Sequence, residues 1–382
     1  MKKILFILDE FYPVTSAPGV RIKSFLDEFE ENSAILLGGA ESKPQKFSFA
    51  LLPVKRPNEK NLIRFIIFLL KMNLVGIIQT YRIKPKAVVV SIPKYELLLS
   101  LPLIRLSGAK IVLDIRDSEK FINYSAYFSH FFPKRLAALF GRIVKSFVNE
   151  LLKICLRISD VITVANEGIY VSLGKYKNKS RIINNGVDTK LFCPQKKNQE
   201  KENGKLNLVY VGNFSEKDDF QIFSGLEEKT KRKIFLHLVG EGRNRQKIID
   251  YLAKAGLNLK FYGRIGHQLL PALLNEMDVG FIFRDGEVQE SIPVAIYEFC
   301  AMGLMTISNK VGIMSQFIEK NRLGKVVSNA SELNLLLNKM LAGRREESRS
   351  CARYLRNKAV KEFSRKKQAQ LFKQEIEKLL LH

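Results

Sequence analysis

The chain has 382 residues, which is too long for one ordinary domain and suits two domains of the α/β type. Its four cysteines show no paired spacing and its four histidines are scattered, so we expect neither a disulfide framework nor a His-based metal site. A formal net charge of +25 favours polyanionic partners, which are nucleic acid, anionic lipid or phosphorylated small molecules.

The first half of the chain alternates short apolar runs with helical stretches. The run Ile4–Leu8 stops at Asp9-Glu10, which makes it too short for a signal-peptide core and predicts a buried strand. Leu62–Gln79 is strongly apolar, but Arg64 and Lys71 interrupt it, so we expect a core helix or one lying in the bilayer surface rather than a span. The other expected strands are Ala34–Leu37, Phe47–Leu52, Ala87–Ser91, Lys110–Ile115 and Val161–Val164, and the other helices are Arg21–Glu30, Glu96–Ser107 and Arg135–Arg157.

A polar segment near Asn184–Lys205 separates this half from a second alternating unit. The strands expected beyond it are Leu206–Val211, Phe235–Val239, Leu259–Tyr262, Val279–Phe283 and Met305–Ser308. Short β-branched runs that alternate with helices are typical of doubly wound parallel sheets. We therefore predict an α/β protein with two Rossmann-like domains facing across a cleft: 1–188, a linker at 189–205, 206–360, and a C-terminal helix at 361–382.

Two basic segments in the first half narrow the choice of polyanion. Lys55–Lys86 holds eight basic residues and one acid, and Phe131–Ile182 holds ten basic residues and three acids. Both interleave their charges with Leu, Ile, Phe and Val. Because this mixture fits a helix lying on a membrane better than a nucleic-acid groove, an anionic membrane surface is the expected partner and nucleic acid is not.

Two carboxylates stand eight positions apart around a predicted helix start. Pro293 is expected to open a helix, which leaves Glu290 in the preceding loop and Glu298 inside the helix. A helix N-terminus suits a phosphate, and carboxylates accept hydrogen bonds from sugar hydroxyls. The pair therefore suits a nucleotide sugar, although acidic residues at this spacing also arise on ordinary solvent-facing helices.

Five short motifs stand in a fixed order along the chain. They are Pro13–Gly19, Asp114–Asp117, Asn185–Asp188 with Phe192, Val209–Asn213 with Lys217, and Glu290–Glu298. Together they closely resemble the retaining glycosyltransferases of the glycogen-synthase-like superfamily, family GT4. The resemblance is strongest from about Val161 to Gly324. It implies the GT-B fold, with a C-terminal helix that often crosses back to the first domain.

The resemblance also implies roles for residues that would bind the donor. Glu298 would hold the ribose hydroxyls, and Glu290 would contact the donor sugar beside the backbone N–H groups of Ser291 and Ile292. The base would be bordered by Arg264 and Ile265. The remaining donor contacts are implied for Gly19, Gly212 and Asn213, where backbone approaches the phosphates or the sugar.

Charge on the departing phosphate calls for a cation, and the resemblance assigns Lys217 to it. Three places depart from the family pattern, and one of them is the Pro13–Gly19 loop, which has one glycine instead of two. Asn213 stands where many members have arginine, and Arg116-Asp117 stands where many have His-Asp. Arg116 would either bind a phosphate or pair with Asp117. We expect Arg284 to be a rim arginine and His267 to face solvent or lie near a helix N-cap.

The function implied is transfer of a sugar from a nucleotide diphosphate sugar to an acceptor hydroxyl, with retention and with no metal or other cofactor. The basic, apolar segments suggest a saccharide or lipid-linked saccharide acceptor and cell-surface polysaccharide assembly. The expected location is cytoplasmic, on the inner face of the cell membrane. The alternatives are a nucleotide-sugar epimerase or hydrolase of the same fold and, less favoured, a basic nucleic-acid-binding protein.

Overall fold

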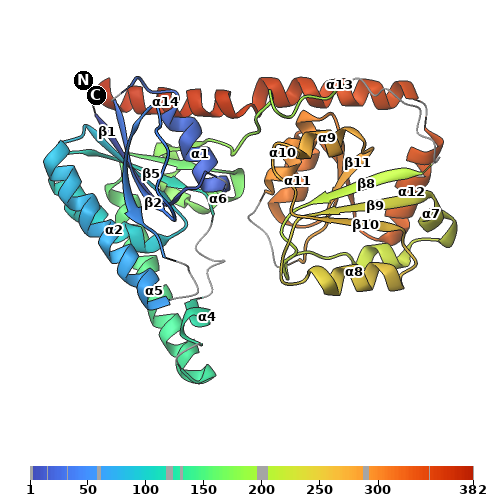
Figure 1. Ribbon diagram of the computed structural model, residues 1–382, viewed down its shortest axis with the longest axis horizontal. Helices are drawn as coiled ribbons and strands as arrows, with labels where there is room; N and C mark the ends of the chain where they lie inside the picture. The colour runs from blue at the N-terminus through green and yellow to red at the C-terminus, as the bar shows by residue number, and fades with distance from the viewer. Residues whose placement is uncertain are drawn as a thin grey trace. The chain divides into compact units, whose positions relative to one another are not determined.

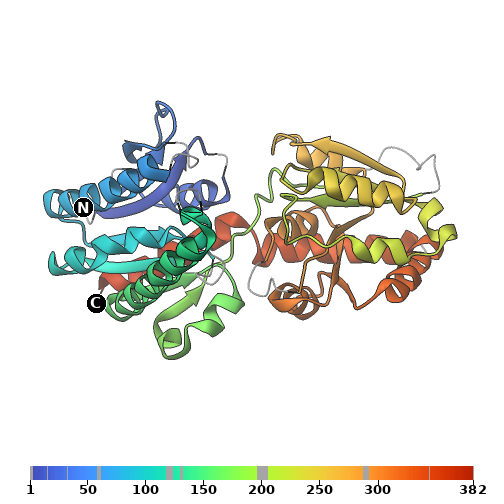
Figure 2. The same cartoon turned by 90° about the horizontal axis from the view of Figure 1, so that it is seen from below.

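The computed structural model describes residues 3–14, 16–31, 33–57, 62–117, 124–129, 132–195, 205–286, 292–343 and 345–381. The chain forms two compact units (Figures 1 and 2). Unit 1 comprises Met1–Asn185 and Gln368–His382, and unit 2 comprises Gly186–Lys367. The chain therefore passes between the units twice, next to Gly186 and next to Gln368.

Unit 1 is built on a seven-stranded parallel sheet in the order β3-β2-β1-β4-β5-β6-β7. This order places a topological switch point between β1 and β4, where ligands bind in open α/β sheets. The strands are β1 (Ile4–Tyr12), β2 (Ala34–Ala40), β3 (Ala50–Lys55), β4 (Ala87–Ile92), β5 (Lys110–Ile115), β6 (Val161–Val164) and β7 (Ser180–Ile182).

Helices cover both faces of this sheet, because side chains alternate from face to face along each strand. Leu5 and Ile7 of β1 enter one core, against the helices that lie along one side of the sheet in Figure 1. Phe6 enters the other core, where Phe25 of α1 stacks on Phe372 of α14. The first group comprises α2 (Leu62–Ile83), η1 (Tyr95–Ser100), α3 (Leu101–Leu106), α5 (Lys134–Ile158) and α6 (Glu167–Ser172), and the second α1 (Ala17–Leu26) and α14 (Arg365–Leu381); the short α4 (Tyr124–Phe128) and η3 (Gly174–Lys179) complete the unit.

Unit 2 repeats the arrangement with six parallel strands in the order β10-β9-β8-β11-β12-β13, and its switch point lies between β8 and β11. The strands are β8 (Leu206–Val211), β9 (Ile234–Val239), β10 (Leu259–Gly263), β11 (Val279–Ile282), β12 (Met305–Asn309) and β13 (Gly324–Val327). The helices are η4 (Gln221–Gly225), α7 (Glu228–Lys233), α8 (Arg245–Lys254), α9 (Leu270–Asn275), α10 (Val294–Ala301), α11 (Gly312–Lys320), α12 (Ala330–Ala342) and α13 (Arg345–Glu362).

The predicted α/β class with two doubly wound sheets is confirmed, and the boundaries differ in detail. The expected linker at 189–205 is partly core, since Phe192 is fully buried in unit 2 and its carbonyl accepts a hydrogen bond from Arg356. Unit 2 begins at Gly186, and the chain returns to unit 1 at Gln368 rather than at 361.

Helix α1 begins four residues earlier than expected. The Ser16 side chain accepts a hydrogen bond from the Gly19 N–H at 3.3 Å, and Pro18 lies in the first turn. Gly19 therefore lies in the first turn of α1. A Cβ at Gly19 would lie 3.1 Å from the Phe11 carbonyl oxygen, so the glycine lets α1 pack closely on β1.

Candidate functional site

The loop after β8 carries Lys217, and a buried aspartate fixes that loop. Asp218 has no exposed side-chain surface, and Arg284, after β11, donates to it at 2.6 Å. Asp218 also accepts from the Tyr210 hydroxyl at 2.8 Å and from the N–H and hydroxyl of Ser215 at 2.8 and 2.9 Å. Arg284 is thus not the free rim arginine that the sequence suggested. It joins the two loops that flank the switch point.

Two further contacts hold this loop. The Lys217 carbonyl accepts from the Asp285 N–H at 2.9 Å, and the Phe283 carbonyl accepts from the Asp219 N–H at 3.2 Å. Burial, followed by the charge of Asp218, raises the pKa of Tyr210 well above its usual range. Gly212 is required by packing, because a Cβ there would lie 2.5 Å from the Tyr210 hydroxyl oxygen. Asn213 follows it and is exposed. Lys217 therefore projects its exposed side chain from a loop whose backbone is held rigidly.

Glu298 lies in α10, which begins directly after Pro293 as predicted. Its side chain is 6% exposed, and its Oε1 lies 3.0 Å from Nε2 of His267. The His267 ring packs on Phe192 with 5.0 Å between ring centroids. Sequence reasoning missed this contact, since 31 positions separate the pair. His267 does not simply face solvent. It fixes one carboxylate oxygen of Glu298, the residue predicted to hold the ribose.

The remaining predicted donor residues of unit 2 fall around this pair or outside the described residues. Arg264 and Ile265 follow β10 on the loop that carries His267, with Arg264 exposed and Ile265 half-buried. Ile292 is 7% exposed and belongs to the core of unit 2. Glu290 and Ser291 lie outside the described residues. The structure thus brings Glu298, Arg264 and Ile265 to one region through His267.

A second charge close to Glu298 comes from the end of unit 2. Burial lowers the pKa of the Arg365 guanidinium, and the negative charges of Asp188 and then Glu298 oppose that shift. Asp188 belongs to the Asn185–Asp188 turn that the sequence singled out. Gly186 in that turn has φ +64°, and a Cβ there would lie 2.9 Å from the Arg365 Cα, so glycine is required.

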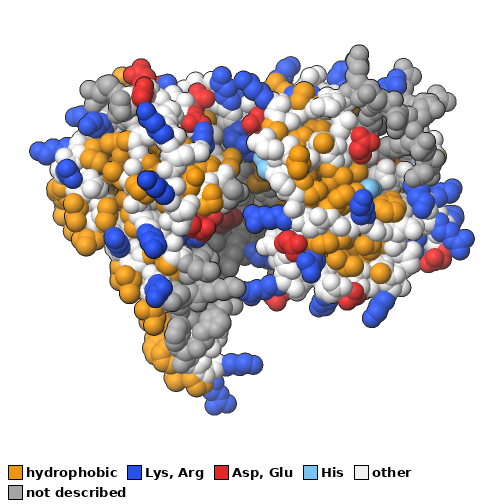
Figure 3. Space-filling model, viewed as in Figure 1, with side chains coloured by type: hydrophobic (Ala, Val, Ile, Leu, Met, Phe, Trp, Pro, Cys, Tyr) orange, Lys and Arg blue, Asp and Glu red, His pale blue; other side chains and the backbone are white. Residues whose placement is uncertain are grey.

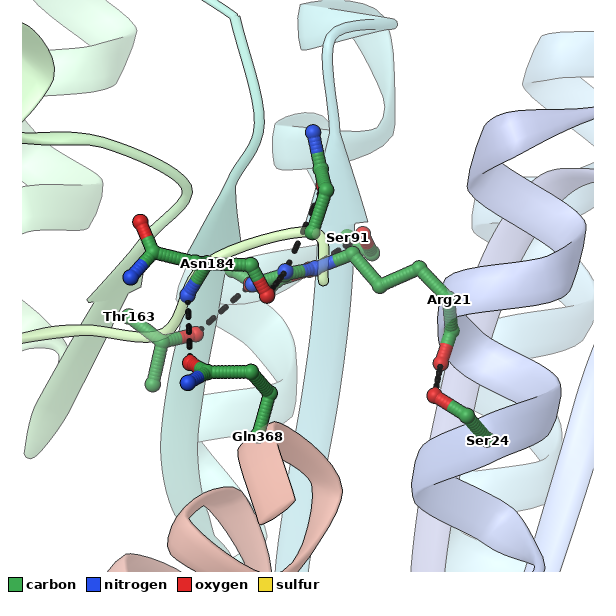
Figure 4. A network of polar contacts seen from close by, with 8 residues as sticks. Arg21, Ser24, Ser91, Thr163, Asn184 and Gln368 are labelled. Carbon is green, nitrogen blue, oxygen red and sulfur yellow. Dashed lines mark hydrogen bonds and ion pairs between the residues drawn. The ribbon is translucent and has the colours of Figure 1, made fainter. Parts of the chain in front are cut away.

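In unit 1 the Asp114–Asp117 motif divides into a structural and an exposed part. Asp114 has no exposed side-chain surface; it accepts from Arg21 at 2.9 Å, Ser91 at 2.8 Å and Thr163 at 2.7 Å (Figure 4). Arg21 continues the network to the Asn184 carbonyl at 2.9 Å, and the Asn184 N–H donates to Gln368 at 2.8 Å. These contacts join the end of the first segment of unit 1, at Asn184, to the start of its second segment, at Gln368.

Arg116 and Asp117 differ from the pair that one alternative proposed. The Arg116 side chain is buried, whereas Asp117 is exposed and its carbonyl accepts from the Tyr95 hydroxyl at 2.8 Å. Within the described ranges, Arg116 forms no ion pair with Asp117. The pairing alternative is therefore not supported, and Arg116 remains a candidate for binding an anion.

Residues 193–358 match the family model of glycosyl transferases group 1. The matched segment contains the Lys217 loop, His267 and Glu298. Most of unit 2 therefore matches a glycosyl transferase group 1 domain. No curated protein sequence matches the chain.

Solved structures share the fold of the whole chain, at low identity. Sucrose-phosphate synthase from Thermosynechococcus elongatus superposes with a TM-score of 0.74 at 13% identity, with 100% of each chain covered. Anabaena Alr3699/HepE in complex with UDP gives 0.71 at 11% identity, covering 98% of this chain and 100% of that one. WaaG, a glycosyltransferase involved in lipopolysaccharide biosynthesis, gives 0.60 at 14% identity, with 96% and 98% covered. The group 1 domain and this shared fold confirm the predicted glycosyltransferase of GT-B type.

Proposed function

We propose that the chain transfers a sugar from a nucleotide diphosphate sugar to an acceptor hydroxyl with retention of configuration. The observation that carries the proposal is the group 1 match over the segment that holds Lys217 and Glu298. The UDP and UDP-glucose complexes of the similar HepE fold support a donor of this class.

Each predicted residue has a physical task in this reaction. Glu298, anchored through one oxygen by His267, would accept hydrogen bonds from ribose through the other. Lys217, on its braced loop, would stabilise the charge that builds on the leaving diphosphate. Glu290 would contact the donor sugar. Catalysis would consist mainly of positioning and charge stabilisation, with no metal or covalent protein intermediate.

A nucleotide screen tests the donor assignment. We expect UDP, GDP or ADP, or one of their sugars, to raise the melting temperature of the wild type and to have little effect on Glu298→Ala. The exposed Glu319 of α11, in the same unit, provides the matched control Glu319→Ala. A nucleotide response that is equal in all three proteins, or absent from the wild type, would show that the site assignment is wrong.

The acceptor side of the proposal rests on an exposed apolar face of unit 1, which we call the α2–α5 face. Its apolar side chains lie mainly on α2 and α5, with two more on α3 (Figure 3). Isolated exposed apolar residues need no explanation, but a continuous set on neighbouring helices does. The set comprises Ile63, Ile66, Ile67, Leu70, Leu74, Ile78 and Tyr81 of α2, Leu103 and Leu106 of α3, and Leu136, Leu139, Phe140, Ile143, Phe147 and Ile154 of α5.

Cations border this face on the same helices. Arg64 and Lys71 of α2 and Arg142 and Lys153 of α5 are exposed. An apolar face rimmed by cations matches an anionic lipid surface, where apolar insertion and charge attraction add. This supports a lipid-linked saccharide acceptor, a cytoplasmic location on the inner face of the membrane, and a role in cell-surface polysaccharide assembly.

Helix α2 contains the one described segment, Ile63–Ile83, that is long and apolar enough to cross a membrane. Its inner side nevertheless belongs to the core of unit 1, where Phe65, Phe68 and Met72 are buried against the sheet. Asn73 on that side donates to the Glu96 carbonyl at 2.9 Å. These contacts favour a helix that lies along the bilayer surface, so that only its outer side contacts lipid.

Vesicle flotation tests the membrane part separately from the donor part. We expect the wild type to float with anionic vesicles and much less with neutral ones, and Phe147→Glu in α5 to reduce flotation strongly. Leu335→Glu in α12 of unit 2 is the matched control, because Leu335 is 72% exposed outside this face. Equal flotation of wild type and Phe147→Glu, or no binding to either vesicle, would remove the membrane proposal.

A further inference from the structure

Three charged residues meet at the carboxyl edge of the first sheet. Strands β1, β4 and β5 are neighbours in the sheet. Asp9 lies near the end of β1, Lys94 follows β4, and Arg116 follows β5 directly. The Arg116 N–H donates to the Ile92 carbonyl at 3.2 Å, which ties the last two strands together at this edge. The edge includes the switch point of unit 1.

Arg116 is unusual there because, among the described residues, its buried charge has no ion-pair partner. Its exposed fraction is 6%, and its Nε is buried with no hydrogen-bond partner. No carboxylate of a described residue forms an ion pair with it. Burial lowers the pKa of the guanidinium, and the charge of Asp9 is the main opposing influence. Burying a charge without an ion-pair partner is unfavourable, so this side chain is held at a cost to folding.

The neighbouring carboxylate does not resolve the imbalance. Burial raises the pKa of Asp9, even though Arg116, Lys94 and Arg56 all act to lower it. Arg56 is engaged elsewhere, since it pairs with Glu41 at 2.9 Å and with Glu10 at 3.3 Å. By contrast, Asp114, two residues before Arg116, has every contact that a buried carboxylate needs. The edge is therefore built differently from the core beneath it.

We propose that Arg116 binds a phosphoryl group of the acceptor, with Lys94 on the same edge of the sheet adding positive charge. A guanidinium presents parallel N–H donors that match a phosphate, and the buried Nε would gain the partner that it lacks within the protein. The proposal rests on the glycosyltransferase function above and adds the chemical class of the acceptor. The phosphoryl group belongs either to a lipid diphosphate or to a soluble sugar phosphate.

Calorimetric titration with inorganic phosphate and pyrophosphate tests the site without any nucleotide. We expect binding by the wild type and by Lys217→Ala, which removes the cation predicted for the donor, and loss of at least tenfold in affinity in Arg116→Gln. The exposed Arg105 of the same unit gives the control Arg105→Gln, which should bind normally. Binding that survives in Arg116→Gln, or that disappears in Lys217→Ala, overturns the proposal.

The melting temperature supplies an independent readout. If the buried charge is kept for a ligand, the melting temperature of Arg116→Gln equals or exceeds that of the wild type. The substitution removes a buried charge that lowers the stability of the fold. If this variant does not fold, Arg116→Lys replaces it. Lysine keeps the positive charge but lacks the parallel N–H donors of the guanidinium. Weaker phosphate binding by Arg116→Lys supports the proposal, and unchanged binding overturns it.

The source of the phosphoryl group follows from two further probes, which are compared with pyrophosphate. Tightest binding of geranyl diphosphate identifies a lipid diphosphate, and tightest binding of glucose 6-phosphate identifies a soluble sugar phosphate. If none of the three probes, pyrophosphate included, binds more weakly to Arg116→Gln than to the wild type, the site is not a phosphoryl site. Nucleotide binding at Glu298 is measured separately, so failure here leaves the donor assignment standing.

Discussion

The two sheets share one topology and use charge in opposite ways at their switch points. In unit 2 the loops after β8 and β11 are joined by the buried Asp218–Arg284 pair, which Tyr210 and Ser215 complete. In unit 1 the corresponding edge holds Arg116 without an ion pair to any described carboxylate. A paired frame fixes a loop in position, whereas an unpaired buried cation is open to a ligand. On our proposals, the paired frame of unit 2 positions the donor, and the unpaired cation of unit 1 binds an anion.

Within unit 1 the same contrast appears between two aspartates. Burial alone would raise the pKa of Asp114, but Arg21, Thr163 and Ser91 outweigh it and leave the pKa lowered. Burial raises the pKa of Asp9, and its neighbouring cations do not overcome that effect. A lowered pKa marks a carboxylate that stabilises the fold, and a raised one marks a carboxylate kept at a cost.

Removing the charge of Asp114 should have the largest effect on stability. We expect Asp114→Asn to lose about 3–5 kcal/mol of unfolding free energy, because Arg21 would remain buried without its partner. Urea denaturation measures this. Lys23→Met removes the exposed pair with Asp27 and should change stability by less than about 1 kcal/mol. Equal losses in the two variants would contradict the structural role of the buried network.

Asp218→Asn should damage the donor frame. The variant weakens the contact to Arg284 and should cost about 2 kcal/mol of stability, with a fall in nucleotide affinity because the Lys217 loop loosens. Glu216→Gln, at an exposed position of the same loop, is the control. If Asp218→Asn lowers stability but leaves nucleotide affinity unchanged, the loop does not position Lys217 for the donor.

Acidification should separate the two aspartates of unit 1. The pKa of Asp114 is lower in the folded protein than in the unfolded chain. Its contribution to the free energy of unfolding is therefore present above the unfolded pKa and is lost as pH falls through the folded pKa. The pKa of Asp9 is higher in the folded protein than in the unfolded chain. Its contribution to the free energy of unfolding is therefore complete below the unfolded pKa and is lost as pH rises through the folded pKa. Asp9→Asn should therefore be more stable than wild type at neutral pH. Unfolding from about pH 2 to about pH 8 shows whether the two variants deviate in opposite directions.

His267→Ala should have the smallest effect. Loss of the hydrogen bond to Glu298 should weaken nucleotide binding about fivefold, which corresponds to about 1 kcal/mol, and His267→Gln should restore part of it. An unchanged affinity in His267→Ala would show that Glu298 needs no second residue to orient it.

The sequence predicted the elements that carry a strong pattern. Runs such as Ala87–Ile92 are buried on both faces and were recognisable as parallel strands. The strands Ser180–Ile182 and Gly324–Val327 were missed, because they are short and mix charged with apolar residues. The 189–205 linker was wrong for Phe192, whose burial depends on contacts far along the chain.

The candidate site was predictable only where a motif is local. Glu298 and the helix after Pro293 lie in one motif, so their relation could be inferred from the sequence. The contacts His267–Glu298, Arg284–Asp218 and Arg21–Asp114 join residues 31, 66 and 93 positions apart. No periodicity records such pairs; they arise from strand order and loop packing. Burial of Arg116 without an ion pair likewise became visible only in three dimensions.

Calorimetric titration of nucleotide diphosphates into wild type, Glu298→Ala and Glu298→Gln tests the central claim most directly. We expect one of UDP, GDP and ADP to bind the wild type, Glu298→Ala to lose at least about tenfold in affinity, and Glu298→Gln to fall between them, because hydrogen bonds to a charged group contribute about 1.5–3 kcal/mol. Equal affinity in all three proteins would contradict the assignment of Glu298 to the nucleotide.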